Sequence, residues 1–185
     1  CFEKLPKNSN WFIGNSLPIR NVDKFVSANH KNVFLIGNRG ASGIDGIISS
    51  ALGVKNNLKK SSKLILLIGD LSFYHDMNGL LLAKRYGINI TIVVENNNGG
   101  GIFNSLDIAK LNIPQFEEYW KTPHDIDFKK VSSLYGCDYF LAEEIKDVPE
   151  LINKSFDIEG IKLIELKINA EKATKNEQKI YDLII

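Results

Sequence analysis

The chain has 185 residues, of which 44% are hydrophobic and 24% are charged, and this composition is typical of one globular domain. It excludes an intrinsically disordered chain and a collagen-like fibre, and a chain of this length buries roughly 70% of its unfolded surface, so no disulfide or structural metal is needed. The 23 Lys and Arg residues nearly balance the 22 Asp and Glu residues, giving a formal charge of +1. We therefore expect no nucleic-acid partner.

Cysteine usage and hydropathy bear on the compartment. Cys1 and Cys137 form neither a disulfide framework nor a metal-binding set, so we expect a reducing, cytoplasmic location. The longest apolar runs, such as 64–68, are far shorter than the ~20 residues of a transmembrane helix, so we expect no membrane span. The sequence has no signal-peptide pattern and does not begin with Met, and we interpret it as part of a longer protein.

Four short runs rich in Val, Ile and Leu predict strands, at 11–13, 33–36, 64–68 and 90–94. Because these runs are nearly continuous rather than alternating, they favour a parallel sheet buried on both faces. Helices are predicted at 18–29, 43–54 and 73–86, with Ser72 as the N-cap of the third; a long loop after Gly101 precedes a helix at 126–135, a strand at 137–141, a helix at 148–156 and a strand at 161–168. The order predicts a single α/β domain with an open, doubly wound, mostly parallel sheet of about six strands and helices on both faces.

Glycines and polar residues gather where the first four predicted strands end, at 14–16, 37–40, 69–70 and 96–99. In an open parallel sheet, ligands bind at the carboxyl ends of the strands. We therefore expect these four segments to converge on one crevice.

Asp70 and Asn97 end two successive strands and are 27 positions apart, the length of one crossover helix and one strand. A carboxylate, an amide oxygen and a main-chain carbonyl from the glycine run are ligands that Mg²⁺ accepts, and they leave positions free for phosphate oxygens and water. Glu95 precedes the asparagines where an apolar strand residue is expected. The spacing predicts a divalent cation between the two strand ends.

Gly69-Asp70, followed at this spacing by Asn96-Asn97, resembles the metal-diphosphate signature of thiamine-diphosphate enzymes. The segments GNSLPIR (14–20), NRGASGIDG (38–46), GDLSFYHDMNGL (69–80) and NNNGGGIF (96–103) together resemble the C-terminal domain of the 2-succinyl-5-enolpyruvyl-6-hydroxy-3-cyclohexene-1-carboxylate (SEPHCHC) synthases, most strongly over 11–106. This resemblance implies a transferase of menaquinone biosynthesis that decarboxylates 2-oxoglutarate and adds the succinyl unit to isochorismate. It also implies thiamine diphosphate and Mg²⁺ or Mn²⁺ as cofactors.

The same resemblance implies roles for individual residues. It implies that Asp70, Asn97 and the Gly99 carbonyl hold the metal, and that Ile44 lies under the bent cofactor. The implied cofactor-binding residues are Ser42, Gly43, Ile44, Gly69, Asp70, Leu71, Ser72, Asn97 and Gly99, and the implied substrate-binding residues are Asn15, Ser16, Arg20, Arg39, Ile102, Phe103 and Leu106. Guanidinium groups suit the two carboxylates that each substrate carries.

The family resemblance also implies parts that these 185 residues lack. In thiamine-diphosphate enzymes an activating glutamate comes from an N-terminal pyrimidine-binding domain of a second subunit, so we expect a homodimer or homotetramer of a longer chain. The N-terminal and middle domains have no counterpart in this sequence. We therefore expect no catalytic residue here and little or no synthase activity from this chain alone.

Several alternatives remain open from the sequence. The chain fits another thiamine-diphosphate decarboxylase or carboligase, a non-catalytic assembly module or, more weakly, a receiver- or flavodoxin-like domain. Individual residues also have simpler interpretations: Asp70 as a turn or N-cap residue, Ile44 as a core residue and Arg20 as a solvated side chain. His75 is interpreted as a capping or packing residue, and His30 and His124 as loop residues.

Overall fold

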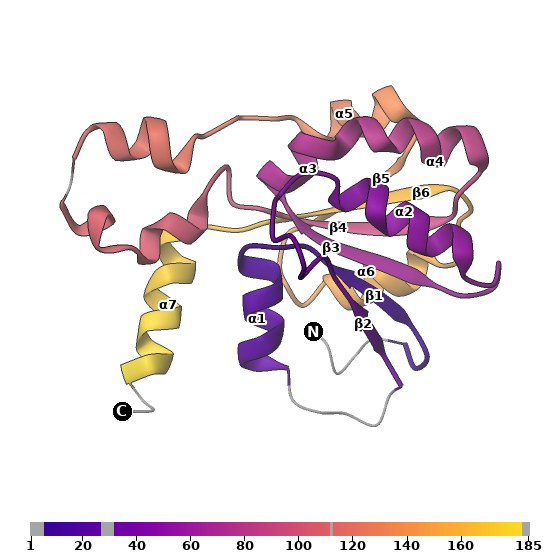
Figure 1. Ribbon diagram of the computed structural model, residues 1–185, viewed down its shortest axis with the longest axis horizontal. Helices are drawn as coiled ribbons and strands as arrows, with labels where there is room; N and C mark the ends of the chain where they lie inside the picture. Colours follow the sequence, from indigo (N-terminus) through magenta and orange to yellow (C-terminus); the bar gives the residue numbers. More distant parts are fainter. Residues whose placement is uncertain (1–5, 27–31, 112, 183–185) are drawn as a thin grey trace.

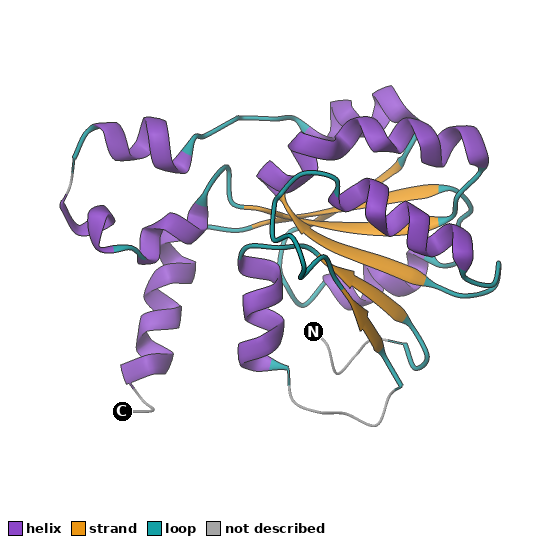
Figure 2. Ribbon diagram, viewed as in Figure 1, coloured by secondary structure: helices purple, strands orange, loops and turns teal. Residues whose placement is uncertain are grey.

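A computed structural model describes residues 6–26, 32–111 and 113–182 (Figure 1). In these ranges the chain forms one six-stranded, entirely parallel sheet with the strand order β2-β1-β3-β4-β6-β5 (Figure 2). The strands are β1 (Asn10–Ile13), β2 (Phe34–Ile36), β3 (Leu64–Gly69), β4 (Ile90–Asn96), β5 (Asp138–Ala142) and β6 (Ile161–Lys167). The predicted α/β class and open parallel sheet are confirmed.

Helices cover both faces of this sheet, as predicted (Figures 1 and 2). One face packs against α2 (Ile47–Asn57), α3 (Asp70–Asp76), α4 (Leu80–Tyr86) and α5 (Phe128–Tyr135), and the other against α1 (Leu17–Phe25) and α6 (Val148–Ser155). Alternate strand residues serve the two cores: Leu66 packs toward α2 and α3, whereas Ile65 packs toward α1 and α6. This double burial explains the continuous apolar runs in the sequence.

The connection from β2 to β3 crosses back over β1, so the chain reverses direction across the sheet between β1 and β3. Gly14, just after β1, donates its N–H to the carbonyl of Leu67 in β3 at 2.7 Å. A side chain on Gly14 would have its Cβ 3.0 Å from that carbonyl oxygen, which explains why glycine fits here. The reversal is the switch point at which ligands bind in open α/β sheets.

Three predicted helix boundaries were wrong. The helix predicted to begin at Gly43 begins at Ile47, because Gly46 has a left-handed backbone (φ 65°) that ends a turn. Ser72 is not an N-cap; α3 begins at Asp70, and Ser72 is buried inside it. The helix predicted at 73–86 is interrupted by a 3₁₀ turn (Met77–Gly79), where Gly79 lies so close to α2 that a Cβ would meet the Ser49 hydroxyl at 2.8 Å.

Two further helices, α1 and α7, also differ from the predictions. Helix α1 ends at Phe25, and residues 27–29 of the predicted helix lie outside the described residues. Helix α7 (Ala170–Asp182) was not predicted; Figure 1 shows it beside α1, to which the Lys24–Glu177 ion pair (2.5 Å) joins it. The residues of α7 are largely polar, so the sequence has no apolar periodicity there from which a helix could be predicted. In the described part of the chain, no helix has both the length and the hydropathy to cross a membrane.

The long segment after β4 forms a separate lobe beside the sheet (Figure 1). It contains two 3₁₀ helices, Gly101–Ser105 and Asp107–Leu111, and a π-helical turn, Glu117–Lys121. The sequence predicted a mobile or functional loop with short helical turns here, and the short helical turns are confirmed. The end of this segment folds back onto the turn that follows β4, where the N–H of Gly100 donates to the carbonyl of Lys121 at 2.7 Å.

Candidate functional site

Asp70 is the centre of a hydrogen-bonded cluster at the ends of β3 and β4. Its carboxylate is 2% exposed as a residue, and Oδ2 accepts the backbone N–H groups of Asn97 and Gly99, each at 3.0 Å. The other oxygen, Oδ1, accepts the N–H of Leu71 at 2.7 Å. The 27-residue spacing thus brings Asp70 and Asn97 together, as predicted, and backbone amides fix the carboxylate in place.

The Asn97 side chain has a carbonyl oxygen that accepts no hydrogen bond. Its Oδ1 is buried and has no hydrogen-bond partner in the part of the chain that the structure describes. The amide lies against Gly101, where an added Cβ would come within 2.5 Å of Nδ2. Since buried polar atoms are nearly always paired, an unpaired oxygen beside an aspartate fits a cation. Among the described residues there is no cluster of three His, Cys, Asp or Glu that could hold a metal.

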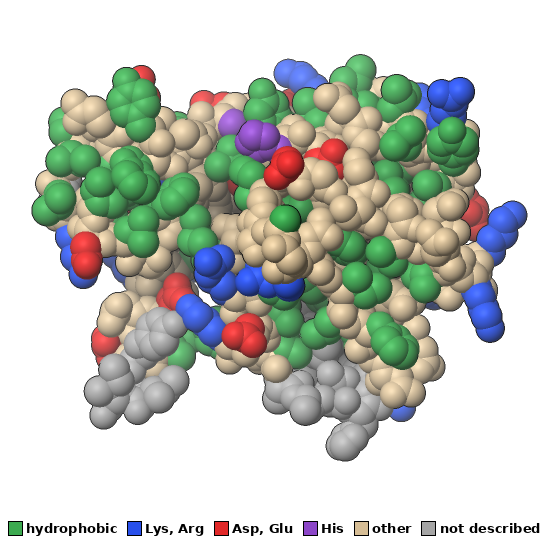
Figure 3. Space-filling model, in the orientation of Figure 1, with side chains coloured by type: hydrophobic (Ala, Val, Ile, Leu, Met, Phe, Trp, Pro, Cys, Tyr) green, Lys and Arg blue, Asp and Glu red, His purple; other side chains and the backbone are tan. Residues whose placement is uncertain are grey.

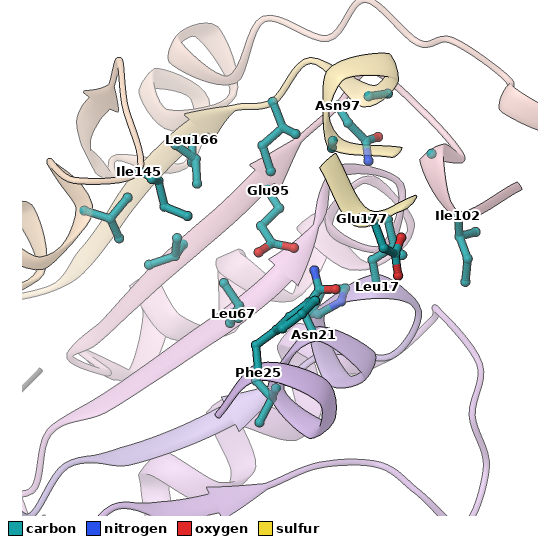
Figure 4. Close-up of a pocket in the computed structure, with 18 of the residues that line it drawn as sticks. Leu17, Asn21, Phe25, Leu67, Glu95, Asn97, Ile102, Ile145, Leu166 and Glu177 are labelled. Atoms are coloured by element: carbon teal, nitrogen blue, oxygen red, sulfur yellow. The ribbon is translucent and has the colours of Figure 1, made fainter. Parts of the chain in front are cut away.

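A second carboxyl group, that of Glu95, lies one strand away on the opposite face of the sheet. Glu95 pairs in register with Gly69, directly before Asp70, and lines a cavity of about 630 Å³ between the sheet, α1, α6 and α7. Figure 4 shows its side chain pointing from β4 into this cavity. Burial raises the pKa of Glu95 to about 7, and the negative charge of Asp70 adds to the rise.

The ends of β1 and β2 form a second polar cluster. Asn15 is buried; its Nδ2 donates to the carbonyl of Gly43 at 2.6 Å, and its Oδ1 accepts from Nη1 of Arg39 at 3.0 Å. One asparagine therefore joins the segment after β1 to two points of the segment after β2. Arg39 remains exposed, so its other guanidinium N–H groups face solvent.

Arg20 contacts the residue next to Asn15 rather than the hydrogen-bonded cluster itself. Arg20 is exposed on α1, and its Nη1 donates to the carbonyl of Ser16 at 3.0 Å, one turn earlier. Ser16 has a left-handed φ of 71° and precedes α1 without capping it through its side chain. Ser42 and Gly43 are exposed, Ile44 is partly buried before α2, and Gly69, Leu71 and Ser72 surround Asp70 in the chain.

The three predicted apolar residues lie at the start of the lobe. Ile102 lines the same cavity as Glu95 and Asn97. The ring of Phe103 meets that of Trp120 edge to face at 5.5 Å, whereas Leu106 is 42% exposed. Figure 3 shows hydrophobic side chains gathered on this side of the molecule, where Leu106, Leu111 and Tyr119 are all exposed.

His124 is the residue that sequence reasoning missed. It was interpreted as a loop residue, yet its Nε2 lies 3.2 Å from Oδ2 of Asp70, and its side chain is only 8% exposed. His75, by contrast, is exposed on α3. Nothing in the sequence links His124 to Asp70, because the irregular loop between them has no periodic spacing from which a contact can be predicted.

Comparisons with known proteins identify the family of this chain. Residues 20–166 match the family model described as thiamine pyrophosphate enzyme, C-terminal TPP binding domain. The chain is 44% identical over 180 residues to the SEPHCHC synthase of Listeria welshimeri, a match that covers 97% of this chain and 30% of the relative. Matches to the synthases of Roseiflexus castenholzii (42%; 90% of this chain, 28% of the relative) and Oceanobacillus iheyensis (40%; 98% and 31%) are similar.

The chain thus spans about 30% of the length of the curated relatives it matches. The matched range, 20–166, contains Asp70 and Asn97. On that match, the chain belongs to the thiamine pyrophosphate enzymes, as their C-terminal TPP binding domain.

Proposed function

We propose that this chain is the diphosphate- and metal-binding domain of a SEPHCHC synthase of menaquinone biosynthesis. The complete enzyme would decarboxylate 2-oxoglutarate and add the succinyl unit to isochorismate, releasing CO₂. The names of the relatives support this reaction, and the observation that carries the domain's part in it is the unpaired Asn97 oxygen beside Asp70. When bound, thiamine diphosphate supplies the electron sink for loss of CO₂ from a 2-oxoacid.

The donor set at the β3 and β4 ends suits Mg²⁺ or Mn²⁺. Asp70 would provide one carboxylate oxygen, Asn97 its unpaired amide oxygen and Gly99 its carbonyl, and the diphosphate would complete the coordination. Backbone N–H groups already hold Asp70, so the carboxylate needs little rearrangement to bind a cation. We propose Gly69, Leu71 and Ser72 beside the diphosphate and Ser42, Gly43 and Ile44 beside the cofactor rings.

The cluster at the β1 and β2 ends is proposed to bind the carboxylates of the substrates. Asn15 holds Arg39 by one guanidinium nitrogen and leaves the remaining donors available for a planar carboxylate. We assign Ser16 and Arg20 to the same role, and Ile102, Phe103 and Leu106 to the apolar wall. This arrangement separates the anion-binding arginines from the cation-binding Asp70, as a substrate lying across the strand ends requires.

We also propose where the activating glutamate comes from and which partners the enzyme has. The activating glutamate would come from an N-terminal domain of a second subunit, in a homodimer or homotetramer. We propose a cytoplasmic enzyme whose partners are its two small-molecule substrates. Without the complementary domain, the isolated chain would hold the diphosphate weakly and would not complete the reaction.

Calorimetry of thiamine diphosphate with and without Mg²⁺ tests the metal site. Binding to the wild-type chain should require Mg²⁺, and Asn97→Ala should weaken it at least about tenfold, because a cation ligand is lost. Gly101→Ala should act in the same direction, since its Cβ displaces the Asn97 amide. Asn153→Ala, at an exposed position of α6, is the matched control. Binding that ignores Mg²⁺ or tolerates both site variants would contradict the proposal.

The substrate assignment is tested by steady-state kinetics in a protein that joins this domain to the other synthase domains. Arg39→Ala should raise the KM for 2-oxoglutarate about 10- to 100-fold, because a charge-assisted hydrogen-bonding pair is lost. Arg85→Ala, on the exposed side of α4, should leave it unchanged. A wild-type enzyme that uses pyruvate as well as 2-oxoglutarate would indicate a different carboligase.

A further inference from the structure

His124 reaches the Asp70 cluster from the end of the lobe. It follows the π-helical turn (Glu117–Lys121) and Pro123, and its Nε2 lies 3.2 Å from Oδ2 of Asp70. Both side chains are more than nine-tenths shielded from solvent. The contact is close, but the N–H is not aligned with the carboxylate as a hydrogen bond, so Nε2 has no hydrogen-bond partner among the described residues.

Several fixed contacts hold the His124 segment over the strand ends. Asn98, whose backbone is left-handed (φ 60°), accepts the N–H groups of His124 and Asp125 on its Oδ1 at 3.3 and 2.9 Å, and donates from Nδ2 to Asp125 at 2.8 Å. The imidazole meets the ring of buried Phe128 edge to face at 6.0 Å. The position of the ring is therefore set by the turn after β4 and by α5.

The partner of the other ring nitrogen determines what Nε2 can do. Nδ1 accepts the backbone N–H of Ile126 at 3.0 Å, and a nitrogen that accepts carries no proton. The proton of the neutral ring therefore lies on Nε2. A protonated nitrogen cannot ligate a cation, so His124 faces the site as a donor.

The site thus contains one unpaired acceptor and one unpaired donor, and both belong to residues that contact Asp70. A cation alone would satisfy the oxygen of Asn97 and leave the N–H of His124 unpaired. A cation bound to an anion satisfies both, because the anion accepts from the N–H. The geometry fits a metal-bound phosphate group better than a free metal ion.

We propose that His124 donates a hydrogen bond from Nε2 to a phosphoryl oxygen of the metal-bound diphosphate. His124 would then be a cofactor-binding residue that the lobe contributes to the strand ends. This inference rests on the proposed function, since it requires a metal-bound diphosphate at Asp70. It assigns the lobe a role in closing the site over the diphosphate.

Calorimetry with two ligands, thiamine diphosphate and inorganic diphosphate, each with Mg²⁺, tests this donor in a protein that joins this domain to the other synthase domains. His124→Ala should weaken both about tenfold or more, since a hydrogen bond to a charged group is lost. His124→Gln, whose amide N–H can reach the place of Nε2, should restore most of the affinity. His75→Ala removes an exposed histidine from α3 and should change neither value.

The remaining outcomes separate a failure of the proposed function from a failure of the His124 inference. If the wild-type protein that joins this domain to the other synthase domains shows no Mg²⁺-dependent binding, the proposed function fails and the inference falls with it. If the wild type binds but His124→Ala binds equally well or more tightly, His124 is a bystander or a plug, and the inference alone is overturned. Equal losses in the Ala and Gln variants would also overturn it. In ¹⁵N NMR of the wild type, Nε2 should keep its proton when the ligands bind, and its loss would indicate a metal ligand instead.

Discussion

Two carboxyl groups on neighbouring strands, Asp70 and Glu95, lie in opposite environments. The carboxylate of Asp70 accepts three backbone N–H groups and has His124 nearby. The carboxyl group of Glu95 has no hydrogen-bond partner in the described ranges and points into an apolar cavity (Figure 4). Asp70 is thus surrounded by hydrogen-bond donors, whereas Glu95 is not.

The difference shows which acid the fold is built to use. A carboxylate surrounded by amide N–H groups is held in one orientation and stays available to a cation. A carboxyl group in an apolar cavity loses its hydration, and its charged form becomes costly. The strand register alone does not explain why Asp70 and Glu95 differ, because Glu95 pairs directly with Gly69, the residue before Asp70. The turn after β4, which aims the N–H groups of Asn97 and Gly99 at Asp70, makes the distinction.

Removing the Asp70 carboxylate should have the largest effect on the stability of the chain. Asp70→Ala leaves one buried and two partly buried N–H groups without their acceptor, so we expect the free energy of unfolding to fall by about 2–4 kcal/mol without any ligand. Urea unfolding at neutral pH measures it, and Asp107→Ala, which removes an exposed aspartate of the lobe, is the control. A loss below about 1 kcal/mol would mean that the N–H groups find other acceptors and that the cluster is not preorganised.

The sequence predicted the sheet better than it predicted the site. Buried strands have continuous apolar runs, so β1, β3 and β4 were found within a residue or two. The pairing of Asp70 with Asn97 followed from strand order and spacing alone. By contrast, His124 comes from a loop whose path depends on Asn98 and on left-handed residues such as Thr122 (φ 45°), and no periodic pattern records such a path. The polar helix α7 escaped prediction for the related reason that it contributes little to either core.

Replacing Glu95 should stabilise the chain, whereas replacing Asp70 should destabilise it. Glu95→Leu replaces an unpaired carboxyl group with an apolar side chain in an apolar cavity, so we expect the free energy of unfolding at pH 8 to rise by about 1–3 kcal/mol. The gain should depend on pH. Because the folded-state pKa is about 7, above the ordinary 4.5, the folded wild type binds more protons than the unfolded chain between these values. Its stability therefore falls as the pH rises from 4.5 to 7, and the variant should lose this part of the pH dependence.

Urea unfolding of both proteins at several pH values between 4 and 8, without metal, measures the effect, and Glu150→Leu on the exposed surface of α6 is the matched control. The difference between wild type and Glu95→Leu should be smallest at pH 4 and largest at pH 8. Adding Mg²⁺ and thiamine diphosphate should narrow it, since a cation at Asp70 offsets the negative charge that helps to raise the pKa of Glu95. A difference that does not change with pH would show that Glu95 is solvated when ionised, and the two acids would then differ in their hydrogen bonds but not in their hydration.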